Sequence, residues 1–171
     1  FLEFRDKLNP ASGFQSMQFR ELEFASGAKD ERILESFTHD EFAYERLTER
    51  FQGNSLADAF WALVKRDGFA VDTHDERVAT IVKILSKPET YPDLYQMQDL
   101  LIDHDENIAL WRSHHVLMVE RMLGMKPGTG GSEGVGYLKT TLEKKFFPEL
   151  WEARTHLKFD PMSVDPGSGP K

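Results

Sequence analysis

Apolar positions along the chain repeat with the three- and four-residue spacing of amphipathic helices, and the alternation typical of strands is nearly absent. One long helical pattern covers residues 90–123, and the polar residues 103–105 could interrupt it. A further helical pattern covers residues 135–147. The sequence therefore predicts an all-α fold, a bundle of roughly seven to nine helices.

Helix starts are predicted by residues whose side chains can accept a hydrogen bond from the first turn. Thr38 with Glu41 and Thr73 with Glu76 have the spacing of a capping box, and each pair precedes an apolar run. Ser55 stands before another apolar run and predicts a third start.

The long pattern contains two adjacent histidines. Its apolar side chains recur at spacings of three and four, at Ile108, Trp111, His115, Met118 and Met122. His115 lies within this stripe, which predicts that it is buried, whereas His114 lies about 100° around the helix. A buried imidazole needs a hydrogen bond or a metal. From spacing alone, a hydrogen-bonded core histidine is the commoner outcome, and a haem ligand is the alternative.

A glycine-rich segment follows the histidines, with six glycines within residues 124–136. It matches neither a phosphate-binding loop nor a dinucleotide fingerprint, because both the spacing and a preceding strand are missing. Two interpretations stay open. The segment is either a mobile linker or a loop that brings its backbone close to a ligand, with Thr129 as the functional side chain at the turn.

Arg5 lies near the apolar positions of the first helical pattern, just before a break at residues 9–13. A guanidinium beside aromatic residues suits a carboxylate that it can bind through two hydrogen bonds. The alternative is a surface salt bridge with Glu3 or Asp6.

Composition narrows the possible classes of protein. The 171 residues favour one domain, and the lack of cysteine excludes disulfides, thiolate metal sites and thiol catalysis. The net charge of −8, without a basic block, argues against nucleic acid as the partner. No apolar run is long enough to predict a membrane span. The chain opens within a helical pattern at Phe1, which suggests a segment of a longer protein.

Three stretches of the sequence resemble the tryptophan 2,3-dioxygenase family. They read FRDKLNPASGFQSMQFRELE (4–23), LWRSHHVLMVERMLGMKPGTGGSEGVGYL (110–138) and KKFFPELWEART (144–155). Together they cover about a third of the chain, in order and at both ends. The resemblance implies a helical bundle of the haem-dependent indole dioxygenase type, with a single domain at 1–157 and a flexible tail at 158–171. Within that domain, residues 28–72 could be a peripheral helical insertion.

The resemblance also implies roles for individual residues. His115 matches the axial ligand of haem iron, and Trp111 matches a residue packed beside that imidazole. Arg5 matches the arginine that pairs with the carboxylate of tryptophan, and Thr129 matches a contact to its amino acid group. The remaining positions match residues that line the pocket: Phe1, Leu8, Ser12 and Gly13.

The activity implied by the resemblance is insertion of O2 across the indole C2–C3 bond of L-tryptophan, which gives N-formyl-L-kynurenine in tryptophan catabolism. The implied cofactor is haem b, and the implied assembly is a cytoplasmic homotetramer without nucleic acid or membrane partners. The family's distal histidine belongs to a segment upstream of residues 4–23 and has no counterpart here, so no catalytic residue is assigned. Either that segment precedes Phe1 in the parent protein, or a separate N-terminal chain supplies it, or this chain is catalytically incomplete. The alternatives are a non-catalytic haem-binding or assembly fragment and a relative that acts on another indole.

Overall fold

The computed structural model describes residues 17–124, 139 and 141–158, and within these ranges the secondary structure is helical without any strand. The all-α prediction is therefore confirmed. In chain order, the helices of the described residues are α2 (Met17–Ser26), α3 (Glu31–Glu35), α4 (Glu41–Gln52), α5 (Leu56–Arg66), α6 (His74–Leu85), α7 (Pro92–Leu123) and α9 (Pro148–Thr155). No helix in these ranges, including α7, combines the length and apolar character needed to cross a membrane.

Two of the predicted helix starts are confirmed, and one is wrong. Ser55 and Thr73 each accept a hydrogen bond from the first turn of the following helix, α5 and α6 respectively, in complete capping boxes. The α4 helix instead begins after Asp40, whose side chain accepts from the backbone N–H of Ala43 at 3.0 Å. Thr38 does not cap α4, because its hydroxyl donates to the Glu35 carbonyl at the end of α3.

The α7 helix is continuous over 32 residues, so the interruption considered at residues 103–105 does not occur. Two of the polar side chains there reach neighbouring elements instead of breaking the helix. The hydroxyl of Ser26 donates to the Leu22 carbonyl and is also hydrogen-bonded to Nε2 of His104, 3.0 Å away. Asp105 is fully buried and accepts hydrogen bonds from the segment before α9.

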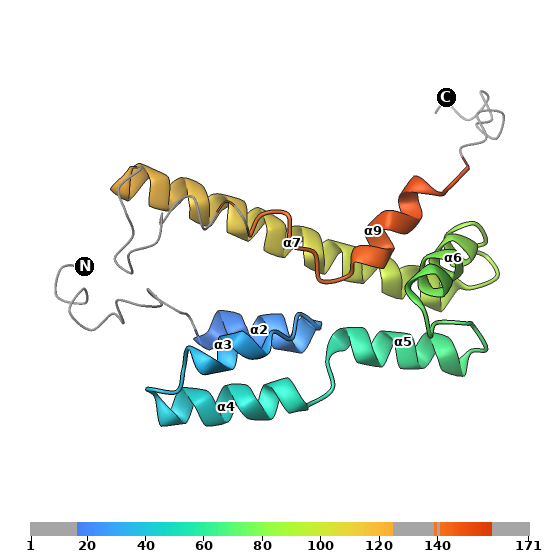
Figure 1. Cartoon of the computed structure of the whole chain (residues 1–171). Helices are drawn as coiled ribbons and strands as arrows, with labels where there is room; N and C mark the ends of the chain where they lie inside the picture. The colour runs from blue at the N-terminus through green and yellow to red at the C-terminus, as the bar shows by residue number, and fades with distance from the viewer. Residues whose placement is uncertain (1–16, 125–138, 140, 159–171) are drawn as a thin grey trace.

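The helix predicted at 135–147 is wrong over its described C-terminal part, because residues 141–147 form a turn and then an irregular stretch. This stretch runs along α7 before α9 begins at Pro148 (Figure 1). Tertiary hydrogen bonds explain the difference, since Arg112 of α7 donates to the Lys144 carbonyl and Asp105 accepts from the Phe146 N–H.

Two apolar clusters make up the core of the described residues. The smaller joins α2, α3 and α4 through Phe24, Leu34, Phe37, Ala43 and Leu47. The larger joins α5, α6, the first half of α7, and α9 through fourteen buried residues that include Trp61, Ile81 and Leu150. In Figure 1, α7 extends along both groups, with α2 below its C-terminal half, α4 farther away on the other side of α2 and α3, and α6 beside its N-terminal end. The peripheral-insertion prediction for 28–72 stays a prediction.

Gly27 lets the chain turn tightly between α2 and α3. Its φ of 128° is a backbone conformation that other residues rarely adopt. A Cβ at this position would also lie 2.8 Å from the Cβ of Ala57, at the start of α5. The turn therefore depends on glycine for two separate reasons, and it sets how closely α2 approaches α5.

A charged cluster joins the start of α6 to α9 and makes the stability of this contact depend on pH. Nε2 of His74 lies 2.8 Å from a Glu152 carboxylate oxygen. That hydrogen bond, helped by the charges of Glu152, Glu149 and Asp75 and opposed by burial, raises the pKa of His74 above its ordinary value. The pKa of His74 is higher in the folded than in the unfolded protein. Its interaction with Glu152 therefore contributes fully to the free energy of unfolding below the ordinary pKa near 6.5, and this contribution is lost as pH rises through the raised pKa.

We therefore expect His74→Gln to lower the thermal midpoint more at about pH 6 than at about pH 8.5, because more of the wild-type imidazole is protonated at the lower pH. Thermal denaturation of both proteins at the two pH values measures the difference. Arg77, which binds Glu149 at 3.2 Å, and His156, 3.8 Å from Glu152, face the same carboxylates. His39→Gln on the α3–α4 connection, outside this network, is the control. An equal loss at both pH values would contradict the assignment.

Candidate functional site

The predicted site residues divide into two groups. His115 and Trp111 lie on the described α7 helix. The predicted substrate-contacting residues lie outside the described residues: Phe1, Arg5, Leu8, Ser12, Gly13 and Thr129. The structure therefore describes the side of the site that would face a cofactor.

Three rings from two helices contact one another in a row that ends at His115. The imidazole of His115 and the indole of Trp111, one turn apart on α7, are nearly parallel, with centroids 5.3 Å apart and planes at 4°. Phe19 of α2 stacks on Trp111, with centroids 4.7 Å apart and planes at 22°. Neither nitrogen of His115 makes a hydrogen bond within the described part of the chain. The described contact of the imidazole is thus the stack of its ring face on Trp111, and its nitrogens are available to bind another group.

The predicted buried stripe on α7 is corrected by the structure. Trp111, Met118 and Met122 are 47%, 49% and 62% exposed, and His115 is half-buried. The helix buries Arg112 and Val116 instead. Sequence periodicity identifies side chains that share a face, but it does not determine which face another element covers. On α7, α2 and the 144–147 stretch approach the side of Arg112.

The uncovered side chains beside His115 form an apolar surface on the C-terminal half of α7. It consists of Trp111, Met118 and Met122, which recur at helical spacing with the histidine. Large apolar groups gathered on one exposed face usually mark a surface that contacts another molecule. Flat aromatic and flexible thioether side chains suit an extended apolar ligand.

Arg112 joins α7 to α2 directly behind this surface. It is 3% exposed, donates to the Lys144 carbonyl at 2.7 Å, and lies 3.4 Å from a carboxylate oxygen of Glu23. Glu23 is also paired with Arg20 of its own helix. Burial lowers the pKa of Arg112, and the charge of Glu23 opposes that shift. Removing either partner of this ion pair would lower the free energy of unfolding, because the other would be left as a buried unpaired charge.

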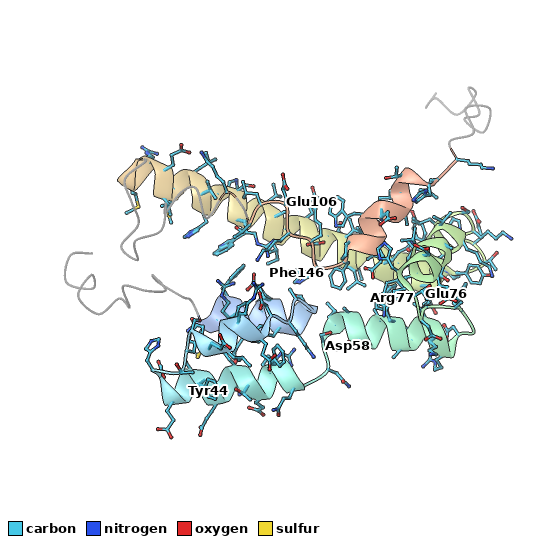
Figure 2. All side chains as sticks on the ribbon, viewed as in Figure 1. Tyr44, Asp58, Glu76, Arg77, Glu106 and Phe146 are labelled. Atoms are coloured by element: carbon cyan, nitrogen blue, oxygen red, sulfur yellow. The ribbon has the colours of Figure 1, made fainter. Side chains whose placement is uncertain are left out.

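Asp105 fixes the 146–147 stretch and α9 against α7. Its carboxylate accepts from the backbone N–H groups of Phe146 and Phe147 at 3.1 and 3.3 Å, and from Nε1 of Trp151 at 2.8 Å. Figure 2 labels Phe146, which lies between α7 and the helices below it. The Phe146 ring stacks on the imidazole of His104, with centroids 6.0 Å apart. The guanidinium carbon of Arg112 lies 5.1 Å from the centroid of the Phe146 ring.

Sequence reasoning missed Phe19, Glu23 and Arg112 as parts of this site. The spacing of Phe19 and Glu23 places them one turn apart on α2, and Arg112 directly follows Trp111 in the sequence. These short-range relations were the signals that could have identified them. The contacts of Phe19 and Glu23 with α7 join positions about ninety residues apart, and periodicity does not predict such long-range contacts.

A hollow of about 530 Å³ lies elsewhere, between α5 and the start of α9. Its charged side chains are already paired, Lys29 with Asp58 and Arg77 with Glu149. Within the described residues, no three His, Asp or Glu side chains gather as ligands for a metal ion. His115 with its ring neighbours is therefore the strongest candidate site in these ranges.

Comparison with known proteins identifies the family. A family model described as tryptophan 2,3-dioxygenase matches residues 35–157, which include Trp111 and His115. Proteins named tryptophan 2,3-dioxygenase are 48% identical to this chain in Nocardioides sp., and 40% identical in both Caulobacter vibrioides and Myxococcus xanthus.

Each alignment covers 92% of this chain, and it covers 59%, 65% and 58% of these relatives, respectively. The chain thus spans about three fifths of the length of the curated relatives it matches. The family match extends over most of the chain, from the end of α3 through α9. The chain belongs to the tryptophan 2,3-dioxygenase family.

Proposed function

We propose that this chain provides the haem-binding face and part of the substrate pocket of a tryptophan 2,3-dioxygenase. The proposed reaction inserts O2 across the C2–C3 bond of the indole of L-tryptophan and gives N-formyl-L-kynurenine. The observation that carries the proposal is His115, whose nitrogens make no hydrogen bond to another described residue and whose ring lies beside an uncovered apolar surface. Relatives at 38–48% identity carry the name of this activity.

The described residues fit haem b as the cofactor. Haem b would need a side chain that binds its iron and an apolar surface for its porphyrin. His115 would hold the iron, and Trp111, Met118 and Met122 would contact the porphyrin. When bound, ferrous haem supplies the redox chemistry that activates O2.

The protein's own task in the proposed reaction is to bind and orient tryptophan. Arg5 would pair with the substrate carboxylate, and Thr129 would contact its amino acid group. The proposed lining of the indole pocket consists of Phe1, Leu8, Ser12 and Gly13. These roles rest on the resemblance of the segments around them. Holding the indole in one orientation is the main rate contribution that such contacts make.

The test is direct. The full chain is loaded with ferrous haem, supplied with O2 and L-tryptophan, and followed by the absorbance of N-formyl-L-kynurenine. Product that depends on all three components supports the proposal. A Soret band without product would identify a haem-binding fragment, and the absence of both would reject the haem assignment. Light scattering of the same sample tests the homotetramer that the family resemblance implies.

A further inference from the structure

Trp111 contacts the proposed axial histidine, but burial does not hold the indole in place. The side chain is 47% exposed, and its stack on His115 is a contact within one helical turn. The described ring contact from another helix comes from Phe19 of α2. The orientation of the indole, and of the imidazole parallel to it, therefore depends on Phe19.

Phe19 is itself held at the α2–α7 junction. The guanidinium carbons of Arg20 and Arg112 each lie 5.8 Å from its ring centroid. Arg112 is buried and bound to Glu23 and to the Lys144 carbonyl, so it offers a fixed surface to the phenyl ring. Three rings are thus connected to a buried ion pair: Phe19, Trp111 and His115.

We propose that Phe19 is a positioning residue for His115, acting through Trp111 to restrict rotation of the imidazole about its Cβ–Cγ bond. The inference rests on the proposed function, in which His115 binds haem iron. The imidazole plane affects how its nitrogen overlaps with the iron, so a neighbour that restricts this plane tunes the axial bond. Phe19 would do so without contacting the cofactor's iron.

The experiment compares Phe19→Leu with Phe51→Leu in the full chain. Phe51 packs edge-on against Phe24 in the α2–α4 cluster, 5.3 Å between centroids, so its loss weakens the same part of the fold without touching Trp111. Phe19→Tyr retains a ring at position 19. Phe19→Met removes the ring but keeps much of the side-chain volume, and it replaces Phe19→Leu if that variant does not fold.

Two readouts report the position of the imidazole. Before haem is added, the ring current of Trp111 shifts the His115 ring protons upfield, and NMR of the histidine-labelled chain detects that shift. After loading with ferrous haem, resonance Raman measures the iron–imidazole stretching band. We expect Phe19→Leu and Phe19→Met to move the proton shifts toward those of a free imidazole, and to broaden the band and lower its frequency. Phe19→Tyr and Phe51→Leu should keep both signals.

The outcomes separate the inference from the function on which it rests. No iron–imidazole band in the unsubstituted protein would overturn the proposed function, and this inference with it. If the unsubstituted protein has the band, the positioning role alone would be overturned by either of two results. The band would be unchanged in Phe19→Leu, or it would shift equally in Phe51→Leu. Unchanged His115 proton shifts in both ring-less variants would do the same without any haem.

Discussion

Replacing His115 with glycine is expected to abolish the Soret band of the haem-loaded protein and, with it, formation of N-formyl-L-kynurenine. Removing the proposed axial ligand leaves the cofactor with apolar contacts alone, which do not hold iron in one position. Absorption spectroscopy after reconstitution and gel filtration measures the retained haem. Free imidazole fits the space left by the side chain, so its addition should restore part of the Soret band to His115→Gly.

His114→Gly is the matched control, because it makes the same substitution one residue earlier on the same helix. The side chain of His114 is exposed and makes no ring contact with Trp111. We expect His114→Gly to retain the Soret band and the activity. Loss of haem from His114→Gly, with retention by His115→Gly, would assign the axial position to the other histidine.

Replacing Asp105 with alanine is expected to produce the largest loss of stability. The substitution leaves three donors inside the protein without an acceptor, at Phe146, Phe147 and Trp151. Unsatisfied buried donors of this kind cost together about 3 kcal/mol of the free energy of unfolding. For a protein of this size, that loss lowers the thermal midpoint by roughly 6–12 °C, which calorimetry of the two proteins measures.

Asp103→Ala on the same helix is the control for the loss of a carboxylate, because the Asp103 side chain is exposed. We expect it to change the thermal midpoint by no more than about 2 °C, because surface substitutions usually change the free energy of unfolding by no more than about 0.5 kcal/mol. Asp105→Asn keeps one acceptor oxygen, so its thermal midpoint should lie between those of Asp103→Ala and Asp105→Ala. Equal midpoints for Asp103→Ala and Asp105→Ala would show that the buried carboxylate does not anchor the 146–147 stretch.

Local signals in the sequence predicted helices well. Ser55 and Thr73 start helices where their capping spacing places them, because the side chain and the N–H group that it accepts from are three residues apart. Gly124 ends α7 with a φ of 61°, which glycine adopts freely. Thr38 was the wrong cap, since its hydroxyl had a competing carbonyl within reach and Asp40 stood closer to the apolar run.

Tertiary contacts account for the errors in the long helix and after it. Residues 103–105 resemble a helix junction in sequence because polar groups cluster there, but two of those side chains bind partners in other elements. Residues 141–147 leave the helical conformation because α7 offers hydrogen bonds to their backbone, from Arg112 and to Asp105. Neither partner is near in sequence, so periodicity could not predict either result.

The sequence by itself determined the helical class and the position of His115 on one helical face with Trp111, because both follow from residue types at short, regular spacing. It also indicated the family, through the resemblance of the stretches at 4–23, 110–138 and 144–155. Only the tertiary structure decided which face of α7 is buried, since that depends on where α2 and residues 144–147 pack. It also brought Phe19 onto Trp111 across about ninety residues of chain. The face that periodicity predicted to be core is instead an uncovered surface beside the histidine, and this exposure suits the proposed haem site.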